Sequence, residues 1–520
     1  MTAVTIETDM DSPGGEELPH AAPRRPRSRG IGGLDTGPTL IVVMLFVLSA
    51  GVMTFVGLMS GFVLLALTGL AWGLFIWRDV HHRDLAQKAN SRLRWWHTVR
   101  KGWDLYLPGS LTVFGTHLVP GTGAQSLLTE GEDIVGHRYA LLTYPQTGHH
   151  VVNISANPNG SALTDPVTVT KQGDQFGRWL TGLGSQPDLV QASISITIAP
   201  DAYPALAREI QENMKADAPA ISRELLNQAL DTYPKGGSTS QSSVSLTFDT
   251  SSEVDRKQFK ADSGVAATRE FLATRLPDIL SDLPATGAGT VRLMDSDDVI
   301  EAVSCAYNPG ERGIYQAIRA RGDSLPVKTW QQAGPSAAKE HWDSYDHSAG
   351  TSITYEVTGF TNQRVAPRAM KPILQEPPAG VHSIRVTWLY RPVSPARSGF
   401  IAEADHAAAQ QRRTSAKKPS ARVMADVKAA DRTRTLEARG SGLINVATLV
   451  TVTVLNAGEQ EKQVAKRRAR SAIDRAGPTA RMLLRIMYGS QASSFAQGVG
   501  QLGLVTDAHL TIPTAFRKAG

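Results

Sequence analysis

The chain has 520 residues, with 54 basic and 48 acidic side chains and a net charge of +6. Its 41% of hydrophobic residues suffice for a sizeable core, which excludes a collagen-like or wholly disordered chain. The single cysteine, Cys305, excludes an internal disulfide framework and a multi-cysteine zinc site.

The N-terminal region divides into a polar tail and an uncharged run. Residues 1–35 combine Pro, Gly, Ser and charges with little apolar periodicity, which predicts a disordered cytoplasmic tail. The 42 residues from Thr36 to Trp77 contain no Lys, Arg, Asp or Glu. Because about 20 apolar residues cross a bilayer, residues 36–77 are predicted to form a transmembrane hairpin of two helices, near Pro38–Thr54 and Gly61–Trp77. A single long tilted helix is the alternative.

Basic residues lie on both sides of the uncharged run. By the positive-inside rule they predict a multi-pass protein of the inner (cytoplasmic) membrane, with both termini and the main domain in the cytoplasm. The stretch Arg78–Lys101 carries seven bases and two acids, a net +5, and is interleaved with tryptophans. This pattern favours contact with anionic lipid over a nucleic-acid patch. The candidate lipid-contacting residues are Arg24, Arg25, Arg27, Arg78, Arg83, Trp95 and Trp96.

Downstream of the hairpin, the sequence alternates strand and helix patterns in two cycles. We expect a basic juxtamembrane linker at 78–130, a first α+β subdomain at 131–335 and a second at 336–520 with long polar helices. Strands are predicted at Tyr139–Tyr144, Val151–Ser155, Ser193–Ile198, Thr290–Met294, Ser352–Thr358, Val381–Tyr390 and Leu443–Leu455, from alternation and β-branched content. Helices are predicted at Ala261–Leu283, from Asp295 or Ser296 to Cys305, at Phe400–Arg439 with an interruption near Pro419, at Gly458–Arg475 and at Thr479–Tyr488. The fold class is therefore α+β, with a transmembrane hairpin followed by ferredoxin-like α/β units.

Common catalytic motifs are missing, so we assign no catalytic residue, cofactor or metal. There is no phosphate loop, Gly-x-Ser-x-Gly elbow, His-Glu-x-x-His or Gly-x-Gly-x-x-Gly. The densest polar-aromatic cluster, His341–His347, holds two His and two Asp, and on a helix Asp343 and His347 would share a face. A metal site is one interpretation; we favour the other, a helix end with Trp342 and Tyr345 packed inward and its polar groups paired.

A second basic region explains the rest of the net charge. Glu403–Arg475 carries fifteen bases and eight acids, a net +7. Its sharpest run, Lys466, Arg467, Arg468 and Arg470, is a candidate surface for a partner or DNA. A solvated helix face is the alternative that we favour.

Three segments of the chain resemble integral membrane proteins of actinobacterial conjugative elements, which take part in type IV secretion. The first, Ala333–His347, has the order of that family in Gly334, Pro335, Ala337, Ala338, Trp342, Asp343, Tyr345 and His347. The second, Ala306–Pro309, is similar to an Ala-Tyr/Phe-Asp-Pro motif, with Asn308 in place of Asp. The third, Leu484–Phe495, resembles a stretch that closes the N-terminal half of the conjugation ATPase.

The resemblance implies a membrane hairpin fused to a domain like the non-motor half of that ATPase. It implies a non-enzymatic inner-membrane scaffold of DNA transfer, which docks a separate conjugation ATPase and other secretion subunits and is expected to be oligomeric. Trp342, Tyr345 and Phe495 are then candidates for the structural core. The alternatives are an accessory membrane component of type VII secretion and a membrane-anchored enzyme of unknown reaction.

Overall fold

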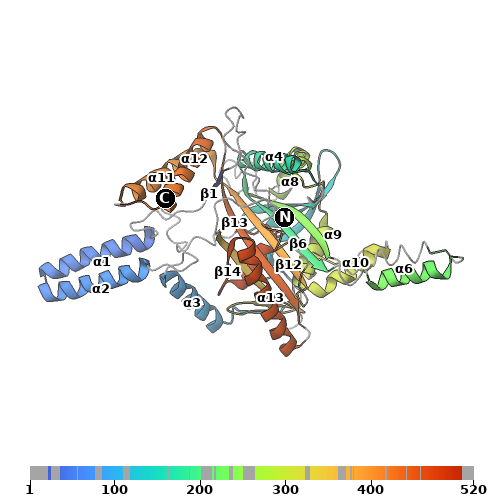
Figure 1. Ribbon diagram of the computed structural model, residues 1–520, viewed down its shortest axis with the longest axis horizontal. Coiled ribbons are helices and arrows are strands. Elements are labelled where there is room, and N and C mark those ends of the chain that lie inside the picture. Colours follow the sequence, from blue (N-terminus) through green and yellow to red (C-terminus); the bar gives the residue numbers. More distant parts are fainter. Residues whose placement is uncertain are drawn as a thin grey trace, which may run out of the picture.

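A computed structural model describes residues 22–24, 36–55, 57–76, 85–108, 117–158, 160, 164–186, 188–200, 214–215, 218–232, 238–249, 264–321, 328–360, 370–374, 377–378, 380–415, 418–440, 442–456 and 458–505. Its centre is a large sheet with helices on both faces, and other helices project from it (Figure 1). The predicted disordered tail lies outside the described residues, apart from a short strand at 22–24.

All fourteen described strands belong to one sheet, which is antiparallel except where β1 pairs parallel with β13. The strands are β1 (Ala22–Arg24), β2 (Leu105–Tyr106), β3 (Leu127–Glu132), β4 (Arg138–Tyr144), β5 (His149–Asn157), β6 (Leu189–Pro200), β7 (Ser238–Asp249), β8 (Thr290–Leu293), β9 (Ala338–Glu340), β10 (Tyr345–His347), β11 (Gly350–Phe360), β12 (Ser383–Pro392), β13 (Leu443–Leu455) and β14 (Met482–Ile486). The helices are α1 (Thr36–Phe55), α2 (Leu58–Ile76), α3 (Leu85–Arg100), α4 (Pro166–Gly184), α6 (Ala220–Thr232), α8 (Gly264–Ser281), α9 (Ser296–Tyr307), α10 (Arg312–Arg321), α11 (Pro395–Ser415), α12 (Ala421–Ala438), α13 (Glu459–Thr479) and α14 (Gln491–Gly498).

The sheet consists of two halves with the same strand pattern. The first half runs β3-β4-β5-β7-β6 with β8 on β5, and the second runs β9-β10-β11-β13-β12 with β14 on β11. The two halves join where β6 pairs antiparallel with β12, and Ser195 faces Thr387 near the middle of that seam. Four strands of each half have the order β8-β5-β7-β6 and β14-β11-β13-β12, which is the strand order of a ferredoxin-like unit, and the pairing of β6 with β12 merges the two sets into one continuous sheet.

Successive side chains along each strand point to opposite faces of the sheet, and the two faces differ in character. One face is apolar: Leu246 and Val450 are fully buried there, and α4, α8 and α13 cover it. The other face is covered by α9, α14 and the segment 498–504, and its centre is a buried polar band. This band contains Asn153, Gln191, Ser193, Ser195, Thr197, Ser243, Ser245, Thr247, Ser352, Thr354, Arg385, Thr387, Thr451 and Thr453.

The backbone and side chains of residues 498–504 satisfy much of this polar band. Thr387 Oγ1 donates to the carbonyl of Gly498 at 2.6 Å, and Thr247 Oγ1 donates to that of Gly503 at 2.9 Å. Buried hydroxyl groups with hydrogen-bond partners cost little, so Ser and Thr occupy interior positions that usually hold aliphatic side chains.

The helices α1 and α2 occupy the uncharged run and pair with each other away from the sheet (Figure 1). Crossing a hydrocarbon core takes about 20 consecutive apolar residues. Within the part of the chain that the structure describes, no helix is long and apolar enough to do so. This finding overturns the predicted transmembrane hairpin at 36–77 and the multi-pass inner-membrane location derived from it.

Several predicted elements are confirmed and others are wrong. The strand near Ser193–Ile198 is β6, and Asp295 caps α9 through a capping box. The helix expected at Phe400–Arg439 is interrupted as predicted, between α11 and α12. The helix expected at Thr479–Tyr488 is wrong, because Met482–Ile486 forms strand β14 on β11.

Candidate functional site

The segment Ala338–His347 forms a β-hairpin and not the expected helix end. In it β9 pairs antiparallel with β10, so that Tyr345 faces Glu340 and His347 faces Ala338. The His341 backbone N–H closes the turn on the Ser344 carbonyl at 2.8 Å. Because neighbouring residues of a strand point to opposite faces, the hairpin sends its aromatic and acidic side chains in different directions.

One face of the hairpin enters a buried aromatic cluster. The ring of Phe495 lies 5.3 Å from Tyr345, 4.6 Å from His347 and 5.1 Å from Tyr307 between centroids. Burial confirms Tyr345 and Phe495 as core residues, at 3% and 0% exposed. The cluster takes one or two residues from each of the three segments that carry the resemblance, so these segments, distant in sequence, meet in space.

Gly334, in the first of the three resembling segments, also contacts Asn308 in the second. Asn308 Nδ2 donates to the Gly334 carbonyl at 3.2 Å, and the Gly334 N–H donates to the His117 carbonyl at 2.8 Å. A Cβ at position 334 would lie 2.2 Å from the Leu118 carbonyl oxygen. Only glycine therefore fits this close backbone approach.

His347 is a neutral, fully buried imidazole. Its Nδ1 donates to the Tyr307 carbonyl at 2.6 Å, and the Ser352 hydroxyl donates to its Nε2 at 2.7 Å. Burial lowers the pKa of His347 to about 4. Both ring nitrogens are thus occupied, and the side chain fixes the hairpin to the sheet.

On the opposite face of the hairpin, Asp346 is held by three donors. Lys462 Nζ of α13 donates to Asp346 Oδ2 at 2.6 Å, His341 Nε2 lies 2.9 Å from the same oxygen, and Thr351 Oγ1 donates to Oδ1 at 2.7 Å. Burial raises the pKa of Asp346, but these donors outweigh it and hold the pKa well below its usual range. The carboxylate is a structural anchor for α13.

Asp343 anchors the next turn of α13. It forms an ion pair with Arg470, and Lys466 Nζ lies 3.8 Å from Asp343 Oδ1 and donates to Ser344 Oγ at 2.8 Å. Burial raises the pKa of Asp343, and the hydrogen bond from Arg470 more than compensates, so the net shift is downward.

In the described residues no group of three or more His, Cys, Asp or Glu side chains is placed to hold a metal ion.

These ion pairs divide the predicted basic surface of α13. Lys466 and Arg470 point at the hairpin, whereas Arg467 and Arg468 are exposed. A run of four bases in sequence is therefore not one continuous surface, because a helix turns neighbouring residues about 100° apart.

Trp342 connects the hairpin to α3. Its ring stacks on Tyr488 at 5.7 Å and lies 6.0 Å from Trp95, and the Arg92 guanidinium lies 6.0 Å above it. Gly489, with φ +69°, passes so close that a Cβ there would lie 2.6 Å from Trp342 Cζ3. Trp342 itself is only partly buried, because α3 covers it incompletely.

The candidate lipid-contacting residues occupy different environments. Trp95 packs on Trp342, whereas Trp96 is 56% exposed beneath the Arg100 guanidinium. Arg24 lies in β1. The remaining four lie outside the described residues, namely Arg25, Arg27, Arg78 and Arg83.

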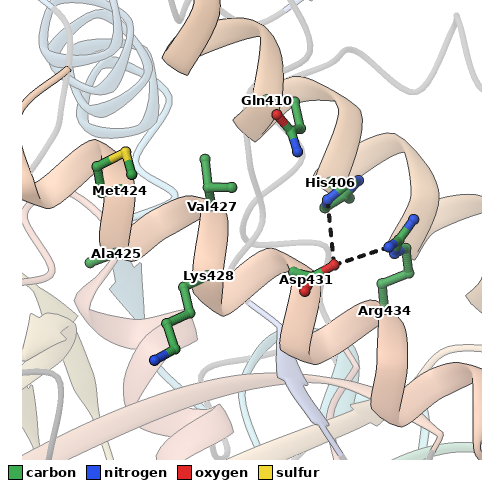
Figure 2. Close-up of a pocket in the computed structure, with 8 residues that line it drawn as sticks. All are labelled: His406, Gln410, Met424, Ala425, Val427, Lys428, Asp431 and Arg434. Atoms are coloured by element: carbon green, nitrogen blue, oxygen red, sulfur yellow. Dashed lines mark hydrogen bonds and ion pairs between the residues drawn. The ribbon is translucent and has the colours of Figure 1, made fainter. Parts of the chain in front are cut away.

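A cleft of about 500 Å³ lies between α11 and α12 (Figure 2). In it Asp431 lies 3.6 Å from His406 Nε2 and accepts a hydrogen bond from Arg434 at 3.0 Å. The lining residues are His406, Gln410, Met424, Ala425, Val427, Lys428, Asp431 and Arg434. Asp431, the acid in this cleft, is paired with side chains of α11 and α12 themselves. The cleft therefore resembles a groove between two helices more than a catalytic centre.

Sequence reasoning missed two buried arginines, Arg312 and Arg385. Arg385 alternates with apolar residues along β12, which is the usual signature of a solvent-facing position. Only the cover over this face of the sheet makes the position interior.

Asp346→Asn is expected to lower the free energy of unfolding by about 2 kcal/mol, because Lys462 would lose its charged partner. The two side chains are only 19% and 14% exposed, which limits solvent screening. Urea denaturation at pH 7 measures the change. The matched control is Glu459→Gln, whose carboxylate lies 3.7 Å from the same Lys462 but is 73% exposed, so its replacement should change the free energy of unfolding far less. Equal losses in the two variants would contradict the anchoring role.

Neither a protein-family model nor a curated protein matches this chain. Its function is therefore inferred from its surfaces and from the chemistry of its residues.

Proposed function

We propose that the chain is a non-catalytic assembly scaffold of a conjugative, type IV-like secretion machine, and that it docks a separate ATPase. The kind of machine follows from the resemblance of three segments to conjugation proteins. The scaffold role is supported by one observation, an exposed apolar surface on the α1–α2 pair.

This surface comprises nine large apolar side chains that are 40% to 84% exposed: Val43, Met44, Phe46, Val47, Leu48, Met59, Val63, Leu65 and Leu67. Contiguous apolar surface of this kind is typical of sites where another macromolecule packs. The pair projects from the sheet and contacts it little, so it is available for assembly (Figure 1).

The other parts of the chain fit a rigid body that presents such elements. The hairpin anchored to α13 contacts α3 through Trp342 and Trp95, and Leu443 of β13 packs against α11 and α12. The exposed Arg467 and Arg468 are a candidate surface for the ATPase or for DNA.

Affinity purification of the tagged full-length chain is expected to recover a phosphate-loop conjugation ATPase. The double variant Met44→Glu/Val47→Glu places charge on the apolar surface and should reduce that recovery at least about tenfold, since buried unpaired charge opposes association. The control is Ile221→Glu, which places charge on an apolar side chain of α6 that is 73% exposed and does not belong to the α1–α2 surface.

Deleting the gene in a donor strain should abolish DNA transfer, and the wild-type copy should restore it. Normal transfer by the deletion strain would contradict the proposal. Recovery of a type VII secretion ATPase in place of the conjugation ATPase would support the alternative machine.

A further inference from the structure

Two arginines lie side by side in the polar band of the sheet. Arg385 on β12 and Arg312 at the start of α10 are each 8% exposed. Arg385 Nε donates to Thr197 Oγ1 at 3.1 Å, and Arg312 Nη1 donates to Gln241 Oε1 at 3.1 Å. Because Thr197 and Gln241 face each other in the β6–β7 ladder, the two guanidinium groups converge on one point.

Neither arginine forms an ion pair among the described residues. The two nearest acids of this region bind other cations: Glu301 pairs with Arg319, and Glu311 pairs with Lys328 at 2.6 Å. The thiol of Cys305 adds no charge, because burial raises its pKa to about 12.

Two buried polar atoms near these arginines have no hydrogen-bond partner among the described residues. Arg385 Nη1 is buried without a hydrogen-bond partner, and so is His382 Nε2. Burial, followed by the charge of Arg312, lowers the pKa of Arg385 to about 10 and that of His382 to about 4. At neutral pH the region therefore holds two cations, and the carboxylate whose charge reaches Arg312, that of Glu301, is already paired with Arg319.

An uncompensated buried charge is among the most costly features of a folded protein, and a like charge beside it adds repulsion. The usual resolution is a bound anion. Guanidinium groups offer planar pairs of N–H donors that match the oxygen spacing of phosphate, sulfate and carboxylate groups.

We propose that Arg312 and Arg385 bind an oxyanion of the phosphate class, either free phosphate or the phosphoryl group of a small ligand. Arg385 Nη1 has no partner and is free to donate to the anion, and the Thr197 hydroxyl and the Gln241 amide supply neutral donors beside it. Because the arginines come from β12 and α10, the anion would fasten α10 to the seam between the two halves of the sheet. This site is independent of the proposed role in secretion.

Isothermal titration of the full-length protein with inorganic phosphate, in chloride buffer at pH 7, tests the site directly. Saturable binding and a rise in melting temperature with phosphate concentration are expected. Absence of phosphate binding by the wild-type protein would overturn the proposal, whatever the variants do. A parallel titration with adenosine monophosphate separates the two sources, since comparable binding indicates a phosphoryl group on a larger ligand and weaker binding indicates free phosphate.

Arg385→Met should abolish the phosphate response and leave the melting temperature in phosphate-free buffer unchanged or higher, because it removes an unpaired buried charge. Arg385→Lys keeps the charge and loses the planar fork, so its affinity should fall at least about tenfold in a protein that still folds. Arg413→Met, on the exposed surface of α11, is the control and should bind like the wild type. A full phosphate response in Arg385→Lys would overturn the assignment of the site.

Discussion

Replacing Phe495 by alanine is expected to lower the free energy of unfolding by about 3–5 kcal/mol. Phe495 is fully buried and its ring contacts those of Tyr307, Tyr345 and His347. Truncation would remove the ring at the point where α9, the β9–β10 hairpin and α14 meet, and the residual cavity would be lined by side chains that are themselves fixed by the sheet. Urea denaturation at pH 7 measures the loss.

Two control variants show whether the loss of stability comes from the buried position of the ring. Phe495→Leu retains most of the apolar volume and should cost about 1–2 kcal/mol. Phe400→Ala changes an aromatic residue that is 73% exposed on α11 and should be nearly neutral. A loss below about 1 kcal/mol in Phe495→Ala would show that the cluster is not a core, because such a value is typical of exposed positions.

Acidification is expected to destabilise the protein strongly between pH 6.5 and about pH 4. Three buried histidines have a pKa lowered to about 4, mainly by burial: His150, His347 and His382. In the unfolded chain these groups titrate near pH 6.5, so between pH 6.5 and 4 the unfolded state binds more protons than the folded state. Stability is therefore retained above pH 6.5 and falls as the pH drops, by about 3 kcal/mol for each such histidine.

The variant His347→Gln isolates one of these contributions. Its free energy of unfolding should be lower at pH 7, but the further loss between pH 7 and pH 4.5 should be smaller than in the wild type. Phe400→Ala, which removes an exposed side chain without a titratable group, should leave the pH dependence unchanged. An unaltered pH slope in His347→Gln would contradict the neutral, buried assignment. The lowered pKa of Asp346 acts in a separate window, because its contribution is present above about pH 4 and is lost at lower pH.

The hairpin at 338–347 accounts physically for the His- and Asp-rich segment His341–His347. Its acidic residues fasten α13, its aromatic residues enter the cluster around Phe495, and Trp342 receives α3. Two His and two Asp within seven residues suggested a metal site as one interpretation. The period-two pattern Tyr345-Asp346-His347 was the available signal for a strand, because alternation sends the acid to one face and the rings to the other.

Local pattern determined many elements of this protein. Alternation along Ser193–Ile198 placed β6, the nearly unbroken Val, Thr and Leu of Leu443–Leu455 placed β13, and the predicted cap at Asp295 or Ser296 placed the start of α9. These signals are local, since period, β-branching and capping depend on residues within one turn or one strand. The sequence also located both basic regions, Arg78–Lys101 and Glu403–Arg475.

Only the tertiary structure decided how these elements combine. It merged the two strand sets through β6 and β12, turned Lys466 and Arg470 inward, and gave no membrane-spanning helix among the described residues. It also covered the Ser- and Thr-rich face of the sheet with residues 498–504 and placed Tyr307 of α9 and Arg312 of α10 near Arg385, so that Arg385 became an interior cation. Whether a polar strand face meets water or another segment depends on residues more than a hundred positions away, and no local pattern in the strand contains that information.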